Sequence, residues 1–239
     1  MFRHISVSRG IWLGGALAFL AVAAASTGAL AHGVQGKDAA FVAANEGAQI
    51  IPFVYLGAKH MVTGYDHLLF ILGVIFFLYR LAHVAIYVTL FSIGHSVTLL
   101  SGVLGGIDVN PYLVDAVIGL SVAYKAFDNL GGFQTLFGFQ PGTRSAVLVF
   151  GLIHGFGLAT KLQDLHLSSD GLLANMIAFN VGVEIGQLFA LSGMLLVIVW
   201  WRASAGFQRQ ALLANVALMF AGFLLTQYQM IGYLTEKGA

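Results

Sequence analysis

Six long apolar runs determine what this chain can fold into. Each run is close to the roughly 20 residues that a helix needs to cross the hydrocarbon core of a bilayer. Because a lipid-exposed backbone must form its hydrogen bonds within the segment, helices are the expected form. The sequence therefore predicts an all-α membrane protein, a polytopic bundle of about six transmembrane helices. We place these helices at about 60–79, 82–104, 111–127, 145–162, 172–200 and 211–233.

Composition supports this fold class and excludes others. Hydrophobic residues make up 59% of the 239 positions and charged residues only 9%, which is unusual for a soluble domain. The formal net charge is +1, and the few basic residues are scattered, so the lipid bilayer is an expected partner and nucleic acid is not. There is no cysteine, so any metal must bind imidazole, carboxylate, amide, hydroxyl or backbone amine groups.

The N-terminus has the features of a bacterial secretory signal. Arg3 and Arg9 precede an apolar stretch, and an A-x-A cleavage site occupies residues 29–31. Cleavage there would leave His32 at the mature N-terminus, where its amine and ring nitrogen would suit one Cu(II) ion. An ordinary exported terminus is the simpler interpretation. The predicted organisation is a signal peptide at 1–31, an exported segment at 32–48 and a six-helix transmembrane domain at 49–239.

The positive residues predict the orientation in the membrane. With the mature N-terminus outside, basic residues fall at the cytoplasmic ends of the runs, in the direction that the positive-inside rule requires. The predicted location is therefore the bacterial inner membrane, with a periplasmic N-terminus. The residues that carry this prediction are Arg80, Lys125, Arg144, Arg202 and Arg209.

The first apolar run opens on "HMVTGYDHLLF", which places ionisable groups where leucine would cost less. In a continuous helix His60 and His67 would share a face but lie roughly 10 Å apart along the axis. Metal–nitrogen bonds are about 2 Å, so such a pair would not hold one ion. Either Gly64 breaks the helix and folds His60 back, or the two histidines are successive stations. We favour the second alternative, with His60 as an entry station on the outer face.

Polar residues in later runs converge on one depth. With a rise of roughly 1.5 Å per residue, His67, His95, His154 and Glu184 fall in a thin slab near the midplane. His95 and His154 alone would be explained by a bond to a neighbouring hydroxyl, and His67 with Asp66 by a structural ion pair. The coincidence of His95 and His154 with the carboxylates of Asp66 and Glu184 favours a site. The predicted metal ligands are His60, Asp66, His67, His95, His154 and Glu184.

Other polar residues are predicted to support these ligands. Ser92 and Ser96 share a helix face with His95, and Glu184 lies at i+4 between Asn180 and Gln187 in a polar stripe. The remaining member, Asp115, is open to three interpretations: a support for the ligands, a gate, or a helix cap after Pro111. Pairs of glycines four residues apart beside His154 and Glu184 predict close helix packing. The supporting residues are Ser92, Ser96, Asp115, Asn180 and Gln187.

These residues resemble the HupE/UreJ family, small membrane proteins associated with hydrogenase and urease systems and regarded as nickel permeases. The family pattern of a histidine, five residues and Asp-His is matched by His60, Asp66 and His67. The resemblance implies that these three residues contribute to nickel passage. It also makes metalloenzyme maturation proteins candidate partners.

The second family motif is only partly present. It is similar to Phe-His-Gly-x-Ala-His-Gly-x-Glu, and "VFGLIHGFG" keeps His154 but has Phe150 for the first histidine and Gly157 for the glutamate. The blocks "GHSVTL", "FGLIHGFGLA" and "FNVGVEIGQ" look like a second, less characterised branch of the family. We predict that Glu184 replaces the missing carboxylate.

Three functions remain open at this point. The leading hypothesis is a permease for a divalent transition metal, with nickel first and zinc, copper or cobalt as alternatives, because imidazole and carboxylate ligands suit borderline ions. The second is a membrane-embedded zinc-dependent hydrolase with Asp66 or Glu184 as the base. The third is a copper-binding or assembly protein that uses His32. We favour transport over catalysis.

Overall fold

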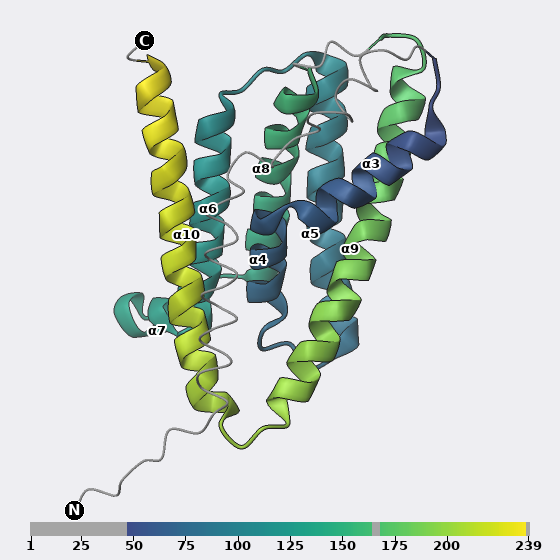
Figure 1. Cartoon of the computed structure of the whole chain (residues 1–239). Helices are drawn as coiled ribbons and strands as arrows, with labels where there is room; N and C mark the ends of the chain where they lie inside the picture. The colour runs from purple at the N-terminus through teal and green to yellow at the C-terminus, as the bar shows by residue number, and fades with distance from the viewer. Residues whose placement is uncertain (1–46, 164–167, 238–239) are drawn as a thin grey trace, which may run out of the picture.

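The computed structural model describes residues 47–163 and 168–237, and within these ranges it contains helices and turns but no strand (Figure 1). The predicted all-α class is confirmed. The signal peptide and His32 lie outside the described residues. The helices are α3 (Ile50–Thr63), α4 (Tyr65–Ile75), α5 (Leu81–Gly105), α6 (Pro111–Asn129), α7 (Gly132–Phe137), α8 (Thr143–Gln163), α9 (Leu172–Arg202) and α10 (Phe207–Lys237).

Membrane-spanning character is clear for four of the described helices. By length and hydropathy, α5, α8, α9 and most of α10 can each cross a bilayer, and α4 is a shorter apolar helix of 11 residues. Large apolar side chains such as Phe189, Leu196 and Trp200 are exposed on α9, as expected for a lipid-facing surface. The chain is therefore a membrane protein. The predicted number of six crossings stays a prediction.

Helix α6 differs from the clearly apolar spans because it is charged and packed inside the bundle. It has 19 residues, carries Asp115, Lys125 and Asp128, and packs against α4, α8 and α10. Two of its charged side chains bond to each other, since Lys125 Nζ donates to Asp128 Oδ2 at 2.5 Å. Pairing explains how these charges are accommodated among apolar helices.

The first predicted span is not one helix. The residues predicted as a continuous helix at 60–79 are divided between α3 and α4, which meet at Gly64. The Gly64 N–H donates to the His60 carbonyl at 2.8 Å and ends α3, while the Gly64 carbonyl accepts from Leu68 N at 3.1 Å and begins α4. With φ −75° and ψ 94°, Gly64 leaves the helical region, so the chain changes direction there (Figure 1).

Three closely packed helix pairs form the bundle: α3 with α9, α5 with α8, and α6 with α10. Each pair is joined where a glycine lies against the backbone of its partner. A Cβ on Gly186 would stand 2.6 Å from the Ala58 carbonyl oxygen, one on Gly94 2.7 Å from the Leu148 carbonyl oxygen, and one on Gly222 2.5 Å from Ala123 N. The close packing predicted from the glycine pairs is present at Gly186 beside Glu184, and also at Gly151 beside His154, where a Cβ would overlap the Phe91 carbonyl oxygen.

Side-chain hydrogen bonds fasten the broken helix to α9 at both ends. Where α3 begins, the Asn175 side chain accepts from Gln49 N at 2.6 Å and donates to the Gly47 carbonyl at 2.9 Å. Where α4 ends, the Arg202 guanidinium donates to the carbonyls of Ile75, Phe76 and Leu78 at 2.8, 2.5 and 2.7 Å. The positive charge of Arg202 also interacts favourably with the negative, C-terminal end of the α4 dipole.

Candidate metal centre

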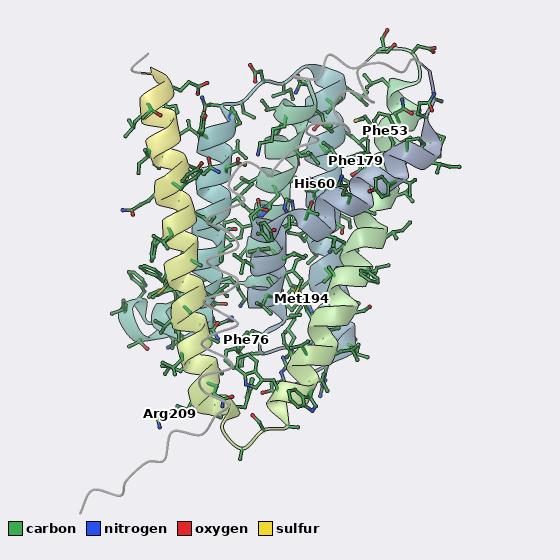
Figure 2. The ribbon with its side chains drawn as sticks, viewed as in Figure 1. Phe53, His60, Phe76, Phe179, Met194 and Arg209 are labelled. Atoms are coloured by element: carbon green, nitrogen blue, oxygen red, sulfur yellow. The ribbon has the colours of Figure 1, made fainter. Side chains whose placement is uncertain are left out.

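Three histidines from three helices meet at the middle of the bundle. His60 of α3, His67 of α4 and His95 of α5 each offer a ligand atom, and these atoms lie within 4.8 Å of one another. Ring centroids are 5.1 Å apart for His60 and His67, 5.7 Å for His67 and His95, and 6.5 Å for His60 and His95. In Figure 2, His60 lies below Phe53 and Phe179 and above Met194 and Phe76. We call these three residues the histidine group.

The helix break accounts for this meeting and corrects one prediction. Because α3 ends before Gly64, the His60 ring contacts the His67 ring. In a continuous helix the two residues would lie roughly 10 Å apart along the axis. The interpretation of His60 as a separate outer station is wrong, and the alternative in which Gly64 folds it back is the one observed. Gly64 also has to be small, since a Cβ there would stand 2.9 Å from His67 Nδ1 and 3.0 Å from the His60 carbonyl oxygen.

Hydrogen bonds orient the rings of two neighbouring histidines. The His67 Nδ1–H donates to Asp66 Oδ1 at 2.9 Å, and the His154 Nδ1–H donates to the Phe150 carbonyl at 2.6 Å. Since a carbonyl or carboxylate oxygen can only accept, these bonds place the lone pair of each neutral ring on Nε2. A carboxylate or carbonyl behind the imidazole is the usual arrangement of a metal-binding histidine. The His154 ring centroid lies 4.9 Å from that of His67.

The imidazole nitrogens of the histidine group are costly to bury. Both nitrogens of His95, which is fully buried, and Nε2 of His67 find no hydrogen-bond partner among the described residues. A buried polar atom left in this way costs about 1–3 kcal/mol. Native structures normally avoid that cost, so the arrangement indicates that these nitrogens have another use.

A small cavity borders the centre on one side. Its volume is about 10 Å³, close to the lower limit for a single water molecule. An ion pair lies in its wall, because Lys161 Nζ of α8 is 2.7 Å from Asp115 Oδ2 of α6. The lining residues are His60, Asp66, His67, Asp115, Ile118, His154, Gly157, Leu158 and Lys161.

Aromatic rings close the other side of the centre. Phe91 lies 4.9 Å and Phe70 5.6 Å from the His154 ring, and Phe70 also lies 5.6 Å from Phe150. Beyond Phe70 and Phe150 is a second pocket, which is too narrow in this structure to hold a water molecule and whose wall includes the Lys125–Asp128 ion pair. The aromatic rings therefore separate two pockets, each with a lysine–aspartate pair.

Glu184 does not join the histidine group among the described residues, nor does it line either pocket. It is only half-buried. The physical reason is the orientation of α9, which turns Gly182 and Gly186 toward α3. Glu184 is two residues from each glycine and so lies roughly 200° around the helix from that face. The carboxylate beside Gly157 belongs instead to Asp115, whose Oδ1 lies 3.4 Å from a Cβ built at that glycine.

The predicted supporting residues have varied roles. Ser92 Oγ donates to Gln187 Oε1 at 2.7 Å, which joins α5 to α9. Asn180 Nδ2 donates within α9 to the Met176 carbonyl at 2.9 Å. Ser96 is half-buried and outside the histidine group of the described chain. Among the supporting residues, Asp115 lines the cavity.

Lys161 is the cavity residue that sequence reasoning did not single out. Its position was readable in principle, because it follows His154 by seven residues and so lies on the same face of α8. Asp115 is not the helix cap that was one of its three interpretations. The Asn110 side chain caps α6 by accepting from Leu113 N at 3.2 Å.

The helices define a polytopic membrane protein, and the site is a buried imidazole centre. The model of the family described as HupE / UreJ protein matches residues 36–237, so the chain belongs to the HupE/UreJ family. This family suggests a transport or accessory role in metal handling, and the histidine group is compatible with that role. No curated protein and no solved structure is similar enough to the chain to be matched.

Proposed function

We propose that the protein is a permease for a divalent transition metal, with Ni²⁺ as the first candidate. The observation that carries this proposal is the meeting of His60, His67 and His95 at a break in a helix, where the buried His95 nitrogens have no hydrogen-bond partner within residues 47–163 and 168–237. Imidazole is a suitable ligand for Ni²⁺, Zn²⁺, Cu²⁺ and Co²⁺. The ion is cargo here, so the same groups must both bind and release it.

The discontinuous helix supports transport over a purely structural metal site. Transporters commonly place the substrate site near the bilayer midplane, where a spanning helix is interrupted. Here α3 and α4 are interrupted at Gly64, and His60 and His67 lie on the two sides of that break. A small change in the angle between the two helices would change the spacing of the ligands, which gives a simple way to release an ion.

The two pockets support a route through the bundle between α4, α6 and α8. One face of α8 contributes Phe150, His154 and Lys161, which follow one another at intervals of four and seven residues. The ion would pass from the Lys161 side to the imidazoles and then past Phe70. In this arrangement the aromatic side is closed, as expected for a carrier that opens to one side at a time.

The positive residues support an orientation for this route. Arg80, Arg144, Arg202 and Arg209 all stand at helix ends on the side of the bundle where α9 ends and α10 begins. Figure 2 labels Arg209 at this end. By the positive-inside rule this end faces the cytoplasm, and the Lys161 side faces the periplasm of a bacterial inner membrane.

Metal uptake by purified protein tests the proposal. Proteoliposomes with wild-type protein should accumulate Ni²⁺, and His67→Ala should abolish accumulation because it removes one of three converging ligands. His83→Ala is the matched control, since His83 is exposed at the start of α5. The proposal is wrong if the wild type takes up no Ni²⁺ and instead holds one equivalent of metal that does not exchange. That result would favour the zinc-dependent hydrolase.

A further inference from the structure

The Asp115–Lys161 pair lies in the wall of the cavity that the imidazoles share. Asp115 comes from α6 and Lys161 from α8, and their charged atoms are 2.7 Å apart. Their side chains are 11% and 20% exposed, so the pair is mostly but not fully removed from solvent. The same cavity is lined by Asp66, by His60 and His67 of the histidine group, and by His154. A second carboxylate and an ammonium therefore face the place where a cation would sit.

A divalent cation in this cavity changes the balance of the pair. It attracts the Asp115 carboxylate and repels the Lys161 ammonium, and both effects are strong where water is scarce. Lys161 lies two residues before Gln163, where its described helix ends, and lysine has a long flexible stem. The ammonium can therefore move to the surface while the apolar stem stays in place. Gln229 of α10 is placed to hold Asp115, with its Nε2 3.5 Å from Asp115 Oδ2.

We propose that Asp115 is a further ligand of the transported ion, and that the Lys161 ammonium occupies this carboxylate until a divalent cation displaces it. The inference rests on the proposed function and adds a selectivity mechanism to it. A monovalent cation brings no more charge than the ammonium that it replaces, whereas a divalent cation brings twice as much. The exchange therefore favours divalent ions, and it keeps Asp115 neutralised between transport cycles.

Displacement can be detected on Lys161 itself. Purified wild-type protein in nanodiscs is treated briefly with a small amine-acylating reagent, with and without saturating Ni²⁺, and labelling of Lys161 is read by mass spectrometry. Release from the ion pair should raise its labelling rate about fivefold, in keeping with a partly exposed pair. Lys59, which is exposed on α3, is the internal reference. His67→Ala, which lacks a proposed ligand, should show no Ni²⁺-dependent change.

Binding measurements on variants give an independent test. Lys161→Met should bind Ni²⁺ about fivefold more tightly than the wild type, because no ammonium competes for Asp115. Asp115→Asn should bind more weakly and should change the visible absorption spectrum of bound Co²⁺, which depends on the ligand set. The control is Arg209→Met, which removes an exposed cation at the start of α10, away from both pockets. This control should leave Ni²⁺ affinity unchanged.

The outcomes separate this inference from the proposed function. If the wild type binds Ni²⁺ but Lys161 is labelled at the same rate with and without it, the displacement is wrong and the permease proposal stands. An Asp115→Asn variant with an unaltered Co²⁺ spectrum equally overturns the role of Asp115 as a ligand. If the wild type binds neither Ni²⁺ nor Co²⁺, both the inference and the proposed function fail.

Discussion

Replacing Gly64 with alanine tests whether the break between α3 and α4 holds the histidine group together. The added Cβ would stand 2.9 Å from His67 Nδ1, 3.0 Å from the His60 carbonyl oxygen and 3.3 Å from Asp66 Oδ1. An ordinary carbon contact begins near 3.4 Å, so the His67 ring must retreat by about 0.5 Å. That displacement is already at the tolerance of a working site.

Alanine also changes the backbone preference at the break. It favours a helical interior over glycine by roughly 0.5–1 kcal/mol, which promotes a continuous helix from α3 into α4. In a continuous helix His60 and His67 would be separated by roughly 10 Å along the axis, and one ion could not reach both. The steric and conformational effects of the substitution therefore act in the same direction.

We expect Gly64→Ala to weaken Ni²⁺ binding about 10- to 100-fold, the usual range when the support of a metal ligand is disturbed. Equilibrium binding to purified protein measures the effect, with thermal unfolding as a check on folding. Gly193→Ala is the control, because a Cβ at that α9 position meets no atom within 4 Å. Wild-type affinity in a folded Gly64→Ala protein would refute the reasoning.

Three other substitutions probe the centre and its surroundings. His95→Leu should abolish Ni²⁺ binding yet raise the unfolding free energy by about 1–3 kcal/mol in chelator, because it removes two buried nitrogens that bond to no other part of the described chain; a lower thermal midpoint would contradict this. Phe70→Ala should join the two pockets and speed Ni²⁺ leakage from loaded proteoliposomes, and it should lower the free energy of unfolding by about 3–5 kcal/mol. Unchanged leakage would count against the route. Asn175→Ala should lose the bonds to Gln49 and Gly47 and destabilise the protein by about 1–3 kcal/mol, read as faster hydrogen exchange at the start of α3.

Much of the fold was readable from the sequence because the bilayer leaves few alternatives. Long apolar runs in a chain with 9% charged residues indicate helices in lipid, and the four long apolar helices lie where such runs were expected. The first run was misplaced because apolar residues continue on both sides of Gly64. Hydropathy records polarity, and it does not record a single backbone torsion that leaves the helical region.

The site was harder to predict because it depends on how each helix is rotated. His67, His95 and His154 were correctly expected to lie close together in depth. Glu184 satisfied the same depth argument, but it lies two residues from Gly182 and from Gly186, so it points away from the face of α9 that packs against α3; depth alone does not record that rotation. Asp115 was noticed without a definite role, since its neighbour Lys161 is 46 residues away in the chain.

The attachment of α9 to both parts of the broken helix has a mechanical consequence. Gly182 and Gly186 fix its upper half against α3, and Arg202 at its end donates to the carbonyls of Ile75 and Phe76, where α4 ends. α9 therefore contacts both helices that meet at Gly64 and restrains the angle between them. That angle, and with it the distance between His60 and His67, is set by a helix that supplies neither imidazole.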